Sequence, residues 1–129
     1  MTPAEALLHD ILGPTRCDVR PLALAMEYTI ESLYHKGRET DMHASKEIYP
    51  HVASELKKDQ RAVAKAIERL TAQCLNALSP EAQEKILGEV LQFRPSPREM
   101  LFYLTYYVYR GRPYRTDNER NPFEPTIAF

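Results

Sequence analysis

The sequence predicts an all-α fold, a compact bundle of about six helices that contains a helix-turn-helix. Proline-containing capping sequences recur at the expected helix starts. Apolar residues recur at intervals of three and four, and no segment shows a convincing strand alternation. At 129 residues the chain is long enough for one domain, which we assign to residues 1–111. Residues 112–129 have no apolar period and are expected to form an irregular or disordered tail.

The first two helices are delimited by capping residues, prolines and glycines. Thr2-Pro3-Ala4-Glu5 combines an N-cap residue, a proline at the first helical position and a capping-box glutamate, and Gly13-Pro14 ends that helix. Pro21 opens the second helix, and Gly37 lies just past its end. The apolar face of the second helix holds Leu22, Met26, Ile30 and Leu33. The polar stretch from Gly37 to Ala44 is expected to be a loop.

The third and fourth helices follow each other closely. Ser45 is expected to cap the third helix, whose apolar stripe is Ile48, Val52 and Leu56. Because a proline is harmless only in the first turn, the regular helix should begin close to Tyr49-Pro50. After a break at residues 57–60, Asp59 caps the fourth helix. One side of the fourth helix is apolar and holds Val63, Ala66, Ile67, Leu70 and Cys74.

The last two helices both begin at serine-proline sequences. Ser79-Pro80-Glu81 opens the fifth helix. Its apolar residues are Ile86, Leu87, Val90 and Leu91. Ser96-Pro97-Arg98-Glu99 combines a capping box with a proline and opens the sixth helix, which runs to Gly111. The core candidates of the sixth helix are Leu101, Leu104 and Val108.

The short connection between the third and fourth helices is typical of a helix-turn-helix, in which the second helix lies in the major groove of DNA. Ala53 would lie where the two helices approach closely, and Lys57 stands near the position that glycine usually takes. On the outward face of the fourth helix, basic side chains can donate to guanine and a glutamate can accept from cytosine, while lysines in the turn meet phosphates. The candidate DNA-binding residues are Lys57, Lys58, Gln60, Arg61, Lys65, Glu68 and Arg69.

The charge distribution is compatible with DNA binding without requiring it. The net charge is −1, whereas a dedicated DNA-binding domain is often basic. Positive charge is concentrated in residues 43–76 and 98–115. An ordinary solvated helix face, with charged residues four positions apart, is the alternative interpretation of the fourth helix.

Two short stretches, Tyr49-Pro50-His51-Val52-Ala53 and Val63-Ala64-Lys65-Ala66-Ile67, resemble the C-terminal DNA-binding effector domain of the sporulation response regulators, the stage zero sporulation protein A family. The similarity extends over roughly residues 5–110, including a first helix that ends in Ile11-Leu12-Gly13 and the turn Arg94–Glu99 before the last helix. Ala64 and Glu68 depart from the family, which usually has a charged residue and an arginine there.

This resemblance implies a winged-helix-like effector fold without strands and a recognition helix at about residues 60–77. It further implies sequence-specific binding of double-stranded DNA and transcription regulation. Tandem copies would contact each other as a homodimer through their C-terminal helices, and RNA polymerase is a further expected contact. The family's effector domain normally follows a phosphoacceptor receiver domain, which we do not expect within this chain.

The sequence favours neither an enzyme nor a metal or cofactor protein. No glycine-rich phosphate loop and no GxSxG sequence is present. His43, Glu47 and His51 would align as metal ligands only on one continuous helix, which Ser45 and Pro50 argue against. Cys17 and Cys74 form no zinc-binding pattern, and Cys74 is expected to be a buried thiol. We therefore expect no catalytic residues, no metal and no cofactor.

Tyrosines crowd the last helix and its end: Tyr103, Tyr106, Tyr107, Tyr109 and Tyr114. They either pack in the core, stack on bases or form a protein interface. The alternative function is therefore a helical protein-interaction module that has lost DNA binding and self-associates, or binds a partner, through this segment. No signal peptide is visible and no apolar run approaches the ~20 residues of a membrane span, so we expect a cytoplasmic protein without membrane contact.

Overall fold

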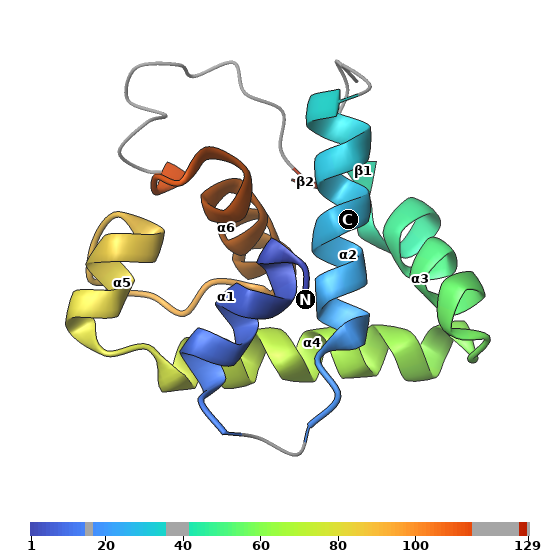
Figure 1. The fold of residues 1–129 in the computed structure, drawn as a ribbon, viewed down its shortest axis with the longest axis horizontal. Helices are drawn as coiled ribbons and strands as arrows, with labels where there is room; N and C mark the ends of the chain where they lie inside the picture. The colour runs from blue at the N-terminus through green and yellow to red at the C-terminus, as the bar shows by residue number, and fades with distance from the viewer. Residues whose placement is uncertain (15–16, 36–41, 115–126, 129) are drawn as a thin grey trace.

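The computed structural model describes residues 1–14, 17–35, 42–114 and 127–128, in which six α-helices share one hydrophobic core (Figure 1). The helices are α1 (Pro3–Leu12), α2 (Arg20–Ile30), α3 (Tyr49–Leu56), α4 (Gln60–Ala77), α5 (Pro80–Leu87) and α6 (Pro97–Arg110). Two π-helical turns, η1 (Glu31–His35) and η2 (Ala44–Ile48), follow α2 and precede α3. The all-α fold class predicted from the sequence is confirmed.

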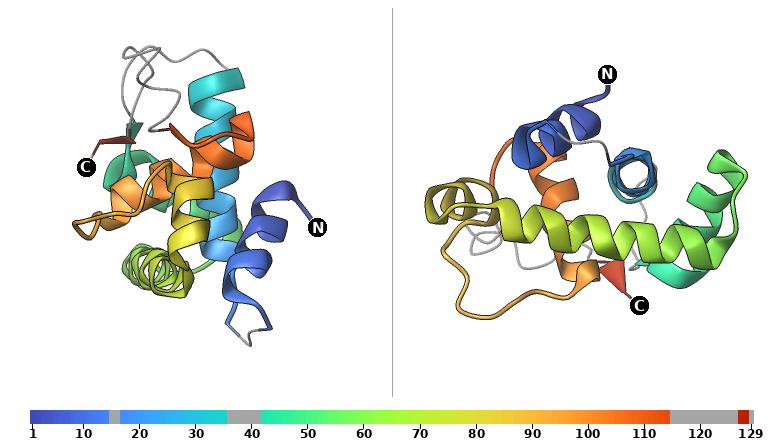
Figure 2. Two further views of the ribbon diagram at one scale, coloured as in Figure 1. Left: turned by 90° about the vertical axis from the view of Figure 1, so that its left-hand side faces the viewer. Right: turned by 90° about the horizontal axis from the view of Figure 1, so that it is seen from below.

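The longest helix, α4, runs across one end of the molecule, and the other helices lie to one side of it (Figures 1 and 2). Helices α2 and α6 pack against each other and against α4, and α1 contacts all three. Helix α3 packs on α2 and α4 near the start of α4, whereas α5 follows the end of α4 and packs on α6. One side of α4 is therefore left uncovered along its length (Figure 2).

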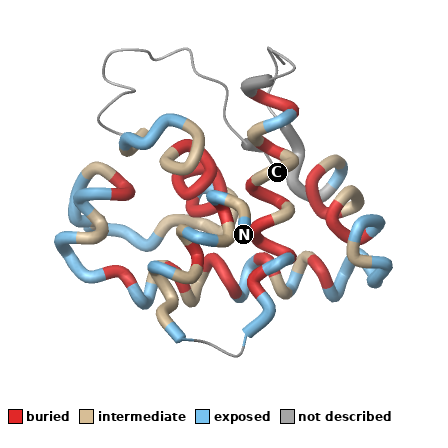
Figure 3. Tube along the Cα trace, viewed as in Figure 1, coloured by how far each residue is buried: buried red, intermediate tan, exposed pale blue. Residues whose placement is uncertain are grey.

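Apolar side chains from all six α-helices meet in the core (Figure 3). The largest fully buried side chains are Leu8, Leu22, Met26, Ile48, Ile67, Leu70, Leu87, Met100, Leu101, Leu104 and Val52. Most of the predicted core residues are buried. The predicted core residues that are only half-buried are Ile30, Leu56, Ala66, Leu91 and Val108.

Four helix starts are capped as the sequence predicts. The N-cap side chains that accept hydrogen bonds from the following backbone are Thr2, Asp59, Ser79 and Ser96. Ser96 and Glu99 form a complete capping box, in which Ser96 Oγ accepts from the Glu99 N–H at 3.3 Å and Glu99 Oε1 accepts from the Ser96 N–H at 3.1 Å. These contacts join residues three apart, so the sequence alone is sufficient to locate them.

The entry into α3 differs from the prediction. Ser45 is not the cap of this helix, because it lies within η2. Ile48, the residue before the helix, already has helical dihedral angles, φ −75° and ψ −53°. The backbone is therefore already helical before α3 begins, and no side chain caps the start of α3. The regular helix begins at Tyr49, as the position of Pro50 predicts.

The end of α5 also differs from the prediction. Val90 and Leu91 were expected on the apolar face of this helix, but α5 ends at Leu87. Gly88 takes the left-handed conformation, φ 95°, and its N–H donates to the carbonyls of Gln83 and Glu84. The side chain of Val90 is 45% exposed, and the Leu91 N–H donates to Gln83 Oε1 at 3.1 Å.

One short pair of strands was not predicted. Met42–His43 (β1) and Ile127–Ala128 (β2) pair in parallel, which brings the end of the chain beside the start of η2. Strands of two residues are too short for any alternating pattern to reveal them. Gly37, most of the expected loop 37–44 and most of the expected tail lie outside the described residues.

Candidate nucleic-acid interface

The turn between α3 and α4 is closed by a Schellman motif. The Lys58 N–H donates to the Ala53 carbonyl oxygen at 3.0 Å, and the Lys57 N–H donates to the Ser54 carbonyl oxygen at 3.3 Å. Lys57 has left-handed dihedral angles, φ 54° and ψ 48°, and so stands where glycine is usual. This conformation costs a residue with a Cβ atom about 1–2 kcal/mol.

The two helices that flank this turn pack closely. Val52 and Ala53 of α3 and Val63 and Ile67 of α4 are all buried, and α3 and α4 are in direct contact. Ala53 is only 7% exposed, in agreement with the expectation that this position requires a small side chain. The relative orientation of α3 and α4 is therefore fixed by packing as well as by the turn.

Helix α4 presents a single continuous outer face. Asp59 caps its start, because its carboxylate accepts from the N–H groups of Arg61 at 3.1 Å and Ala62 at 3.3 Å. The buried residues of α4 are Val63, Ile67, Leu70, Thr71 and Cys74. All seven candidate DNA-binding residues are exposed, on α4 or in the turn before it: Lys57, Lys58, Gln60, Arg61, Lys65, Glu68 and Arg69.

Glu68 lies on the flank of this face that is turned toward α3 and α6. Burial is the main cause that raises the pKa of Tyr49 to about 12; the charge of Glu68 acts in the same direction, and that of Arg98 opposes it. Both charged groups therefore lie near the Tyr49 hydroxyl. Glu68 of α4 and Arg98 of α6 thus both approach Tyr49 of α3.

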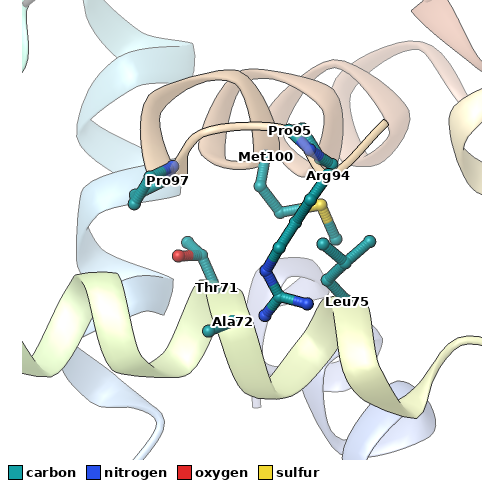
Figure 4. Close-up of a pocket in the computed structure, with 7 residues that line it drawn as sticks. All are labelled: Thr71, Ala72, Leu75, Arg94, Pro95, Pro97 and Met100. Atoms are coloured by element: carbon teal, nitrogen blue, oxygen red, sulfur yellow. The ribbon is translucent and has the colours of Figure 1, made fainter. Parts of the chain in front are cut away.

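The segment between α5 and α6 runs along the same flank of α4. Arg94 Nη1 donates to Asn76 Oδ1 at 2.9 Å, near the end of α4. The segment and α4 enclose a small cavity of about 50 Å³, and the Arg94 side chain extends over Ala72 and Leu75 at its edge (Figure 4). The full lining is Thr71, Ala72, Leu75, Arg94, Pro95, Pro97 and Met100. This cavity is far smaller than the ~300–1,000 Å³ of a typical ligand site.

The sequence does not identify Arg94 and Arg98 as candidate site residues. They are separated from the fourth helix by a whole helix and a loop, and only the packing of α6 on α4 brings them beside it. The one available signal is the excess of arginine in residues 98–115, which includes Arg98 but not Arg94. Charge composition alone does not indicate which element those arginines approach.

The tyrosine cluster is divided between core and surface. Tyr103 and Tyr106 are buried, and Tyr114 closes over Phe102 and Tyr106 in edge-to-face contacts with ring centroids 4.5 and 5.1 Å apart. Tyr107 and Tyr109 are half-buried. Packing in the core thus accounts for Tyr103, Tyr106 and much of Tyr114.

The histidine, cysteine and acidic side chains of the described part of the chain do not gather into a further cluster. That part contains no group of three or more histidine, cysteine or acidic side chains able to hold a metal ion. Cys74 is fully buried, as expected, and burial raises the pKa of its thiol to about 12; Cys17 is exposed. None of the described helices combines the length and the apolar character of a membrane span.

Comparisons with protein-family models, with curated proteins and with solved structures give no match to this chain. The function therefore has to be inferred from the arrangement of residues around α3 and α4.

Proposed function

We propose that this protein is a DNA-binding transcription regulator in which α3, the turn Lys57–Asp59 and α4 act as a helix-turn-helix. One observation carries the proposal: a capped helix of 18 residues follows a tight left-handed turn and exposes Arg61, Lys65 and Arg69 on the outer face of its N-terminal part. A helix of this kind fits the ~12 Å width of the major groove.

The proposed roles follow from the position of each side chain. Arg61 and Lys65 lie one turn apart on the exposed face and donate to guanine O6 and N7. Lys57 and Lys58 extend from the turn at the start of the helix and contact phosphates. Glu68 approaches Tyr49 and contributes a repulsive charge to the phosphates on that side.

The sequence resemblance to effector domains of sporulation response regulators supports the same proposal. On that basis we propose that the chain acts in the cytoplasm and binds DNA as adjacent copies. Contact with RNA polymerase would follow from regulation of transcription.

The decisive experiment measures the affinity of the whole chain for a pool of random duplex DNA by fluorescence anisotropy, at a low and a high salt concentration. Arg61→Ala and Lys65→Ala are expected to cost about 1–3 kcal/mol of binding free energy each and to relax the choice of base at single positions. Lys85→Ala, which removes an exposed charge from α5, is the matched control. No salt-sensitive binding by the wild-type chain, or equal binding by all four proteins, would refute the proposal.

A second candidate function is a protein-interaction module. Among the described residues, Val90 and Phe93 are large exposed apolar side chains, and both lie on the segment that enters α6. Phe93 is 85% exposed although Arg94 beside it is bonded to α4. A concentration-dependent mass in light scattering that Phe93→Ser abolishes would favour this function. A monomer at all concentrations would count against it.

A further inference from the structure

Two arginines from outside α4 lie on one flank of this helix: exposed Arg94 in the segment before α6, and half-buried Arg98 in the first turn of α6. Arg94 is exposed, and its hydrogen bond to Asn76 holds the guanidinium against the last turns of α4 (Figure 4). A guanidinium has five N–H donors, so the bond to Asn76 is compatible with a contact to a phosphate. The Arg94 guanidinium is thus held beside α4 and keeps N–H donors for a further hydrogen bond.

Arg98 lies further toward the middle of the same flank. Pro97 and Met100, on either side of it in the sequence, line the small cavity with Thr71 and Ala72 of α4. Arg98 lies near enough to Tyr49 to affect its titration, as does Glu68.

The dimensions of α4 suit a duplex that lies along the whole helix. Eighteen residues give a length of about 27 Å, and exposed polar or charged side chains occur from Arg61 to Asn76. Glu68, which like Arg98 approaches Tyr49, and Asn76, which accepts a hydrogen bond from Arg94, are about 12 Å apart along the axis of α4. Phosphates line both sides of a major groove, so a helix in the groove brings its flanks close to the two strands.

The charges on this flank of α4 also favour contacts between the two arginines and a phosphate strand. Glu68 would repel a phosphate strand passing along the α6 side of α4. Arg94 and Arg98 supply two positive charges on that side, which offset the carboxylate. The opposite end of α6 carries Arg110, whose guanidinium lies 4.8 Å from the ring centroid of Tyr109, so basic residues of α6 are not all directed toward α4.

We infer that Arg94 and Arg98 form a second set of phosphate contacts, so that DNA lies along the full length of α4 and one strand passes over the segment that enters α6. This inference rests on the proposed function and deepens it. It names the DNA backbone, rather than base edges, as the ligand of these two side chains.

The test measures the dependence of DNA affinity on salt for the wild-type chain, Arg94→Ala, Arg98→Ala and the double variant, on one random duplex pool. Each lost phosphate contact lowers the slope of log K against log salt by about 0.9, so the double variant should lose nearly two. Base preference in a selection experiment should stay as in wild type, because phosphate contacts weaken binding to all sequences alike. Lysine at both positions should preserve most of the slope.

Arg110→Ala is the matched control, since it removes the same charge from the other end of α6 and should keep the wild-type slope. Thermal unfolding of each variant verifies that the substitutions leave the fold intact. A wild-type chain that binds DNA while Arg94→Ala and Arg98→Ala keep its slope would overturn this inference alone. A wild-type chain that binds no DNA would overturn the proposed function, and the inference with it.

Discussion

Lys57 is held in its left-handed conformation by hydrogen bonds from the turn to carbonyl groups of α3 and by the packing of the helices that it joins. Among the described residues it is the single non-glycine residue with a positive φ. A glycine would relieve the strain of the Cβ atom, yet it would also remove a positive charge from the surface where we place DNA. Glycine at this position would therefore favour stability, whereas lysine favours DNA binding.

Lys57→Gly is expected to raise the free energy of unfolding by about 0.5–1 kcal/mol, because glycine adopts this conformation without steric cost. DNA affinity should fall at the same time, with a loss of about one in the salt slope. Chemical denaturation and anisotropy measure the two effects. Lys58→Gly is the control, since the φ of Lys58 is not positive, and it should weaken binding without any gain in stability. Equal stability changes in both variants would contradict the assignment of strain to Lys57.

Glu68 is the one acidic residue of α4, and its side chain is exposed on the same outer face as Arg61 and Lys65. Glu68→Gln is expected to tighten binding to random duplex DNA roughly two- to fivefold at low salt, since it removes a carboxylate from the path of a phosphate strand. The gain should shrink as salt is raised. Glu81→Gln, an exposed change on α5, should have no effect. If Glu68→Gln bound no more tightly than wild type at any salt concentration, Glu68 would not face the DNA backbone.

At the scale of elements, the candidate site depends on how α3 is set against α4. The capping residues and the apolar stripes of these helices follow from the sequence, because each contact joins residues at most four apart. The way the chain enters α3 does not follow from it, since the π-helical turn η2 replaces the side-chain cap expected from Ser45. Likewise the end of α5 is set by Gly88, against an apolar pattern that continues to Leu91.

Ala53→Leu tests the contact between these two helices. The extra carbon atoms should cost about 1–3 kcal/mol of stability, because the buried position has no room for them without shifts of α3 or α4. Urea denaturation measures this loss. Ser54→Leu adds a larger side chain at the next, exposed position of α3 and should change stability by less than about 0.5 kcal/mol. Equal losses in the two variants would mean that the α3–α4 contact is not closely packed.

At the scale of the whole molecule, burial alters the chemistry of two groups that lie far apart in the sequence. Cys74 of α4 and Tyr49 of α3 both lose water contact, which raises both pKa values to about 12. Their ordinary values are 9.0 and 10.0, so the folded protein binds protons that the unfolded chain releases at alkaline pH. The stabilisation is complete below about pH 9 and is lost as the pH rises toward 12.

The free energy of unfolding is therefore expected to be level near neutral pH and to fall from about pH 9 upward. Urea denaturation at a series of pH values measures the profile. Tyr49→Phe and Cys74→Ala should each flatten the decline, because each removes one of the two titrating groups, while Cys17→Ala, at an exposed position, should leave it unchanged. A decline that persists unaltered in both buried-site variants would show that other groups cause it.

Where most helices begin, which side of each is apolar and which residues of the fourth helix lie outward could be predicted from the sequence, because those properties depend on neighbours within one or two turns. Which charges share a surface could not be predicted, since that depends on how the helices pack. Arg94 and Arg98 reach α4 because α6 folds back onto it, and Tyr103 and Tyr106 are buried because α6 packs against α2 and α4. Contacts between residues on different helices are fixed by how whole helices pack, and no local pattern encodes that packing.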